Sequence, residues 1–116
     1  MNFTENKMDI QTRIVGAKVL LTVTERMDAV SAPRFEAACL ELLEQGHAVQ
    51  IADLGGLEYI SSAGLRSILG AGKKLKSAGG SLSFCGLSGM VEDVFRVSGF
   101  LKLFKVHDSA TEALEG

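Results

Sequence analysis

Two adjacent serines, Ser61 and Ser62, stand in the segment YISSAGLRSIL, where an apolar run passes into a helical pattern. A serine hydroxyl can act as a nucleophile, cap a helix or accept a phosphate. Nucleophilic serines in hydrolase folds occupy a G-x-S-x-G turn. The sequence ISSAG lacks the first glycine, and no histidine base is evident near it. Helix capping is therefore the role that these residues favour by themselves.

The stretch GAGKKL at 70–75 resembles a phosphate-binding loop only superficially. The loop pattern requires glycine where Ser67 stands and a hydroxyl where Lys74 stands. Leu75 replaces the third glycine of the dinucleotide-binding pattern. The stretch also falls inside a predicted helix, whose backbone N–H groups are already bonded. The sequence therefore predicts no nucleotide site and no cofactor at this position.

Histidines and carboxylates form no recognisable catalytic or metal-binding set. His47 and His107 each lack a cysteine or histidine at ligand spacing, and we expect both to be solvated loop residues. Asp28, Asp53 and Glu58 fall near one end of the predicted sheet, but no spacing rule pairs them. We therefore expect no metal site and no enzymatic activity.

Composition indicates one globular domain spanning residues 1–116. The chain has 47% hydrophobic and 22% charged residues with a net charge of −2, which disfavours nucleic acid as a partner. No apolar run is long enough to span a membrane, and MNFTENKMDI lacks signal-peptide features, so we expect no membrane partner and a cytoplasmic location. Cys39 and Cys85 lie in apolar settings typical of core residues.

Hydrophobic periodicity predicts an alternating series of strands and helices. Gly16 suits the first position of a two-residue hairpin between the first two strands. Ser31 and Gly46 suit the start and end of the first helix, and Ser88 suits the start of the third. The expected strands are 7–15, 18–25, 48–54, 81–87 and 103–106; the expected helices are 31–46, 62–76, 88–99 and 108–116.

This order predicts an α/β fold with a mixed, mostly parallel sheet of about five strands, an N-terminal antiparallel pair and about four helices. The two serines then follow the carboxyl end of the central strand, where such folds place their functional groups. One of them should cap the second helix. The positive end of that helix would also tolerate a phosphate.

The sequence resembles the STAS domain family, specifically its stand-alone bacterial anti-sigma factor antagonists. The resemblance extends from MDAVSAPRFE through the Asp53-Leu54 strand end to SGFLKLFKVHDSATEAL, and it is most specific in SSAGL at 61–65. The family's usual run there begins Asp-Ser. Ser61 therefore replaces an acidic residue, and Ser62 occupies the serine position.

The resemblance implies an anti-sigma factor with serine kinase activity as partner. The unphosphorylated protein would bind it and free a sigma factor, phosphorylation of Ser62 would break the complex, and a phosphoserine phosphatase would reset it. Ser61 is the second-choice acceptor. The implied partner-binding residues are Asp28, Ser61, Ser62, Gly64 and Arg66.

Two alternative functions stay open. The chain could be a STAS module that regulates another assembly, in lipid transport or stress signalling, or less plausibly an enzyme of unknown type. The residues themselves predict that Gly64 allows a close approach and that Leu65 anchors the second helix in the core.

Overall fold

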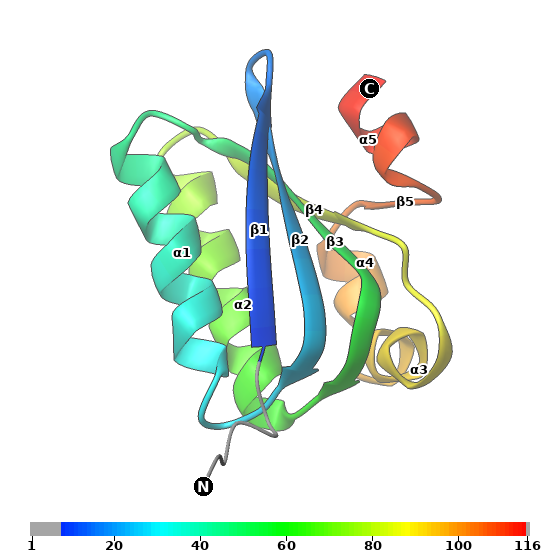
Figure 1. The fold of residues 1–116 in the computed structure, drawn as a ribbon. Coiled ribbons are helices and arrows are strands. Elements are labelled where there is room, and N and C mark those ends of the chain that lie inside the picture. The colour runs from blue at the N-terminus through cyan, green and yellow to red at the C-terminus, as the bar shows by residue number, and fades with distance from the viewer. Residues whose placement is uncertain (1–7, 116) are drawn as a thin grey trace, which may run out of the picture.

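A five-stranded sheet forms the centre of the computed structural model, which describes residues 8–115 (Figure 1). The first strand pair is antiparallel and the remaining pairs are parallel. The predicted mixed sheet is therefore confirmed. Its strands lie across the sheet in sequence order: β1 (Met8–Val15), β2 (Lys18–Met27), β3 (Val49–Ile60), β4 (Ser81–Cys85) and β5 (Val106–His107).

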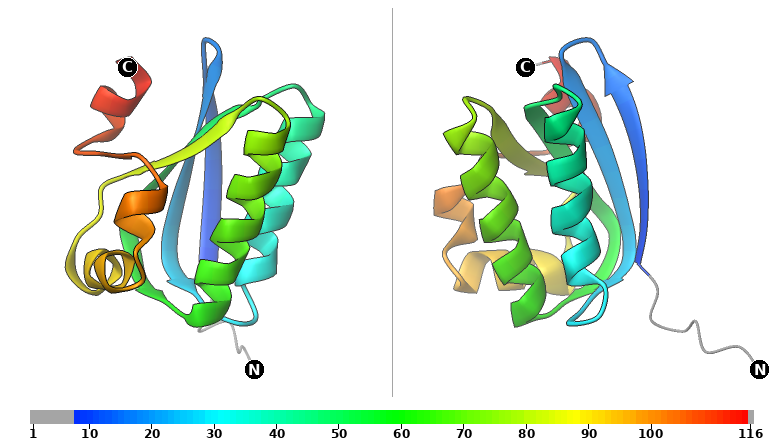
Figure 2. Two further views of the ribbon diagram at one scale, coloured as in Figure 1. Left: turned by 180° about the vertical axis from the view of Figure 1, so that it is seen from behind. Right: turned by 90° about the vertical axis from the view of Figure 1, so that its left-hand side faces the viewer.

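Helices cover both faces of the sheet, but unequally. α1 and α2 lie side by side on one face, and α5 lies on the other (Figure 2). α3 and α4 close the side of the molecule next to β4 (Figure 1). The described helices are α1 (Ala32–Glu44), α2 (Ser62–Ser77), α3 (Gly89–Val97), α4 (Phe100–Leu103) and α5 (Ala110–Glu115).

The hydrophobic core is divided by the sheet because successive strand residues face opposite sides. The larger part lies under α1 and α2 and includes Cys39. The smaller part lies under α5, where Leu20, Ile51 and Cys85 contact Ala113. Burial raises the pKa of the Cys39 thiol to about 12 and that of Cys85 to about 11. Both cysteines are core residues, as predicted.

The predicted turn residues lie where the sequence placed them. Gly16 turns the hairpin with a φ of +61°, and Gly46 follows the end of α1 with a φ of +95°. Ser31 and Ser88 do occupy the residues before α1 and α3, but neither side chain makes a capping hydrogen bond. The prediction that these serines precede the two helices is therefore confirmed, and the prediction that their side chains cap them is wrong.

The central strand is longer than predicted, because β3 continues to Ile60 instead of ending near Leu54. Two glycines, Gly55 and Gly56, suggest a loop by local preference. However, β2 extends to Met27 and offers a pairing edge along this whole length. β3 follows that edge with two register shifts, which accommodate the glycine-rich stretch as bulges.

The end of the chain also differs from the prediction. Of the expected strand 103–106, Leu103 ends α4, a single turn that follows Gly99 at a φ of +83°, and only Val106 belongs to β5. Edge-to-face packing explains this turn, because the Phe100 ring lies 5.4 Å from that of Phe95 and the Phe104 ring 5.2 Å from that of Phe84, measured between centroids.

His107 does not lie in a solvated loop, as the sequence had suggested. It belongs to β5, its side chain is only 12% exposed, and its Nδ1 lies 3.6 Å from a carboxylate oxygen of Glu112. No helix among residues 8–115 is long and apolar enough to cross a membrane.

The face of α2 that packs on the core differs from the prediction. Ile68 is fully buried, whereas Leu65 is only partly buried and lines a groove against α3. The prediction that Leu65 is the core anchor is therefore wrong. The buried residues of α2 are Gly64, Ser67, Ile68, Ala71 and Leu75.

Truncation of these two side chains should separate core from surface. We expect Ile68→Ala to lower the free energy of unfolding by about 2–5 kcal/mol, and Leu65→Ala by less than about 2 kcal/mol, because only the first leaves a cavity in the core. Urea denaturation followed by circular dichroism measures both. An equal loss for the two variants would contradict this packing.

Candidate functional site

The first turn of α2 is fixed to the end of β2 through Ser61. Its backbone N–H donates to the Met27 carbonyl at 2.9 Å, and its hydroxyl accepts from the Gly64 N–H at 3.2 Å. Ser61, one of the two serines between which the sequence left the choice open, is thus the N-cap, with extended backbone angles. Its hydroxyl is committed to the fold.

Ser62 differs from its neighbour in both exposure and bonding. It is exposed at the first position of α2, and its hydroxyl makes no hydrogen bond with residues 8–115. The first turn of α2 contains no acidic residue, so nothing there offsets the positive end of the helix. A free hydroxyl therefore lies where added negative charge is favoured.

Gly64 is buried because α2 begins in close contact with the two neighbouring strands. A Cβ at this position would lie 2.7 Å from Ile60 Cγ1 and 3.1 Å from the Met27 carbonyl oxygen. The second contact is with backbone, which cannot move aside cheaply. The close approach predicted for Gly64 thus occurs within the domain itself.

The loop between β2 and α1 is ordered by Asp28. One carboxylate oxygen of Asp28 accepts from the N–H groups of Val30 and Ser31, both at 3.0 Å. The Ser31 hydroxyl accepts from the Asp28 N–H at 2.9 Å and donates to the Arg26 carbonyl at 2.9 Å. These bonds explain why Ser31 does not cap α1.

The hydrogen bonds of this loop favour the charged form of Asp28. Donation from the Ser31 N–H is the main cause that lowers the pKa of Asp28, and the Arg26 charge contributes in the same direction. The ordered loop presents Val30 at 83% exposure.

A groove of about 240 Å³ lies between the start of α1 and the start of α2. Ala29, next to Asp28 in the loop, and Arg66 on α2 both line it, and Arg66 is exposed. Of the implied contact residues, the structure therefore brings Asp28, Ser61, Ser62 and Arg66 to one end of the molecule. Gly64 lies beneath this surface.

Sequence analysis missed two features near this surface. The Arg26 guanidinium lies 4.2 Å from the Tyr59 ring centroid, and these residues are opposite each other in β2 and β3. Met90 and Val97 are exposed beside Leu65 in a groove of about 340 Å³. A second apolar stripe in α3, at positions 90, 94 and 97, was the available signal.

The groups exposed at this surface are suited to recognition. No group of three or more histidine, cysteine or acidic side chains in the described part of the chain is placed to hold a metal ion. The GAGKKL stretch lies within α2, as predicted. An exposed hydroxyl can accept a phosphate. A fixed carboxylate and a cation can bind groups of another protein.

Two curated relatives are both named as anti-sigma factor antagonists. The chain is 39% identical over 87 residues to BtrV of Bordetella bronchiseptica, named as a candidate anti-sigma factor antagonist, with 75% of each chain covered. It is 30% identical over 102 residues to the anti-sigma-B factor antagonist of Bacillus subtilis, covering 88% of this chain and 84% of the relative.

Solved structures show the same fold. A candidate anti-sigma factor antagonist from Thermotoga maritima superposes with a TM-score of 0.85 at 24% identity, covering 91% of this chain and 92% of the other. Bacillus SpoIIAA in its phosphorylated form superposes with a TM-score of 0.72 at 20% identity, covering 92% and 97%.

The profile of the STAS domain matches residues 7–113. This match covers all five strands and the helices that flank them up to residue 113 in α5, together with the serine at the start of α2. The chain therefore belongs to the STAS domain family, and the relatives named above are anti-sigma factor antagonists.

Proposed function

We propose that this protein is an anti-sigma factor antagonist controlled by phosphorylation of Ser62. In the unphosphorylated form it binds an anti-sigma factor that is also a serine kinase, and this binding frees a sigma factor. The observation that carries the proposal is the exposed, unbonded hydroxyl of Ser62 at the start of α2. The names of the relatives support the same function.

The proposed contact surface consists of Asp28, Ser61, Ser62, Gly64 and Arg66. Asp28 fixes the loop that presents Val30. Arg66 offers an exposed cation beside that loop. Gly64 contributes indirectly, because its close packing against Met27 holds the first turn of α2 beside the loop.

The two serines have different roles in this proposal. The Ser61 hydroxyl already accepts a bond from the Gly64 N–H, so its modification would remove the helix cap. Ser62 can be modified without breaking a bond within residues 8–115. Aspartate and serine are about equally good N-caps, so Ser61 can replace an acidic residue without loss of the cap. The replacement removes one negative charge beside the acceptor.

Phosphorylation would act through charge. A phosphoserine adds about 1.5–2 negative charges at pH 7, which must be desolvated when a partner docks. Arg66 lies four residues after Ser62 on the same helix, a spacing at which opposite charges attract. We expect the phosphate to compete with the partner for Arg66 while the helix itself stays intact.

The proposed cycle needs two further proteins and no catalysis by this chain. A phosphoserine phosphatase would restore the hydroxyl. Because the kinase uses ATP, we place the cycle in the cytoplasm. The protein itself would be a regulator and not an enzyme.

The position of the phosphate is the first prediction. Incubation with ATP and a purified anti-sigma factor kinase that the protein binds should modify Ser62, because that hydroxyl is exposed and unbonded. Ser62→Ala should abolish labelling, and Ser61→Ala should retain it with reduced stability. Mass spectrometry locates the phosphate. Labelling that persists in Ser62→Ala and is lost in Ser61→Ala would reverse the assignment.

The second prediction separates charge from unfolding. Affinity for the kinase should fall at least about tenfold on phosphorylation, roughly 1.4 kcal/mol, while the protein stays folded. Calorimetric titration and thermal melting of both forms measure this. A fall in melting temperature of more than about 8 °C, well beyond the effect of 1 kcal/mol, would show that local unfolding carries the signal.

The third prediction concerns Asp28. Asp28→Ala should weaken partner binding at least about tenfold, a change of roughly 1.4 kcal/mol, because the loop loses its acceptor. Asp28→Asn keeps an oxygen that can accept the same bonds, so it should retain more affinity. Titration of both variants with the kinase provides the comparison. Equal losses would show that the partner binds the charge directly.

The two alternative functions make different predictions for the same preparations. An antagonist should capture a kinase-like protein from a lysate of its own organism and hydrolyse no nucleotide. A STAS module of a transport or stress assembly should instead capture membrane or signalling components. Turnover by the isolated protein would support the enzyme alternative and contradict the proposal.

A further inference from the structure

A cavity of about 500 Å³ lies at the opposite end of α2 from Ser62. It adjoins the exposed edge of β4 and is bounded by the end of α2, the segment from α4 to β5, and α5. Its volume falls within the range of about 300–1,000 Å³ that is typical of small-molecule sites. None of the proposed partner-binding residues lines it.

The cavity has two apolar walls, one on each side of β4. Val49, Ile51 and Ala113 form the wall on the α5 side, and Leu103 and Phe104 form the wall on the α2 side. Gly72 lets the second wall form, because a Cβ at that position would lie 2.7 Å from the Phe104 ring. An elongated apolar group could therefore lie across the sheet edge.

The sheet edge itself offers hydrogen bonds. Among residues 8–115, β5 pairs only with Phe84 and Cys85. The Phe84 N–H donates toward this edge, to the Lys105 carbonyl at 3.0 Å. Leu82 lies two residues earlier, so its N–H and C=O point to the same edge, where no strand meets them. The cavity is therefore bordered by a backbone donor and acceptor.

All ionisable side chains that line the cavity are basic. They are Lys18, Lys76, Lys105 and His107, and no aspartate or glutamate is among the lining residues. This is unusual in a chain with 14 acidic and 12 basic residues. Within the described residues, neither Lys76 nor Lys105 forms an ion pair. Two cations are therefore available to a ligand.

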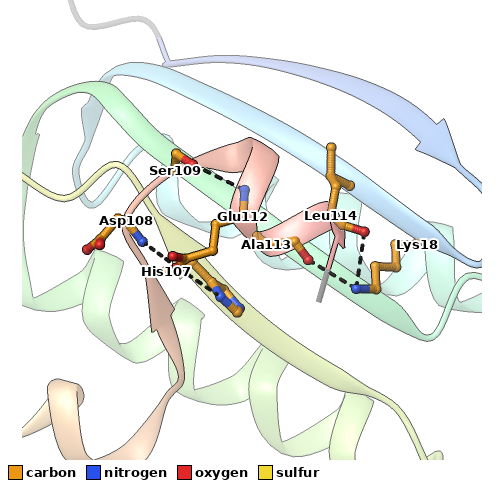
Figure 3. Close-up of polar contacts among 7 residues, drawn as sticks. All are labelled: Lys18, His107, Asp108, Ser109, Glu112, Ala113 and Leu114. Carbon is orange, nitrogen blue, oxygen red and sulfur yellow. Dashed lines mark hydrogen bonds and ion pairs between the residues drawn. The ribbon is translucent and has the colours of Figure 1, made fainter.

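The remaining two basic residues hold the wall in place. The Lys18 ammonium donates to the carbonyls of Ala113 and Leu114 at 3.0 and 3.4 Å, at the end of α5 (Figure 3). Glu112 lies near His107 and accepts from the Asp108 N–H at 3.0 Å (Figure 3). These contacts fasten α5 over the sheet, which preserves the cavity without a ligand.

We infer that this cavity binds an amphipathic anion, a molecule with an extended apolar body and one carboxylate or phosphate end. The body would lie along the two apolar walls, and the anionic end would lie between Lys76 and Lys105. Both features come from the lining: the walls offer apolar contact, and Lys76 and Lys105, although exposed to solvent, are free to attract a negative charge. This site is independent of the proposed switch at Ser62.

Three probes separate the two features of the proposed ligand. Octanoate has both the apolar body and the anionic end, octanol has only the apolar body, and acetate has only the charge. Calorimetric titration of the full chain should give saturable binding of one octanoate, weakening as salt increases. Octanol and acetate should each bind at least tenfold more weakly. Amide chemical shifts should move at Leu82 and Lys105 and stay unchanged at Ser62.

Charge-removal variants provide the control. The double variant Lys76→Gln/Lys105→Gln should weaken octanoate binding at least tenfold, whereas Lys73→Gln/Lys102→Gln removes two exposed charges outside the cavity and should leave it unchanged. Melting curves check that both variants fold. Equal binding by the two double variants, octanol binding as tight as octanoate, or shifts centred on the exposed Val97 would each overturn the inference.

Discussion

The contact between the end of β2 and the start of α2 is the constraint on which the proposed contact surface depends. The Ser61 N–H donates to the Met27 carbonyl, and Gly64 packs so closely on Met27 that a larger residue would displace the helix. Asp28 immediately follows Met27. The same contact therefore fixes where Ser62 lies and where the Asp28 loop begins, so two segments far apart in sequence form one surface.

The length of β2 makes this contact possible. β2 has ten residues and continues well past the point where β4 ends its pairing with β3. β3 follows β2 over that distance and so delivers Ser61 beside Met27. Had β3 ended near Leu54, as the sequence suggested, the serines would follow a loop of several residues. The strand pairing thus replaces a flexible connection with a fixed one.

Most of the fold could be predicted because periodicity and turn residues agree over long segments. Gly16 and Gly46 each mark a turn or a helix end that depends on local sequence. The errors arise where distant residues decide. The extension of β3 depends on β2, and α4 depends on the packing of Phe100 and Phe104. No local pattern contains that information.

The candidate site shows the same division. Either serine could have been the N-cap from sequence, and only the bond from the Gly64 N–H to the Ser61 hydroxyl distinguishes them. The structural role of Asp28 required the positions of Val30 and Ser31. Lys18, Lys76, Lys105 and His107 are spread over ninety residues, and only the packing of α5 and α4 against the edge of β4 brings them around one cavity.

The two ends of α2 carry opposite electrostatic preferences, which follow from the helix itself. Ser62 lies at the end that favours negative charge, and Lys76 lies in the last turn, where positive charge is favoured. A helix of 16 residues is about 24 Å long, so charges at its two ends are screened from each other at physiological salt. Coupling between the ends would require an element with two alternative arrangements. α2 is packed along its length through Gly64, Ile68 and Leu75. We therefore expect the proposed switch at Ser62 and the proposed ligand site at the other end of α2 to act separately.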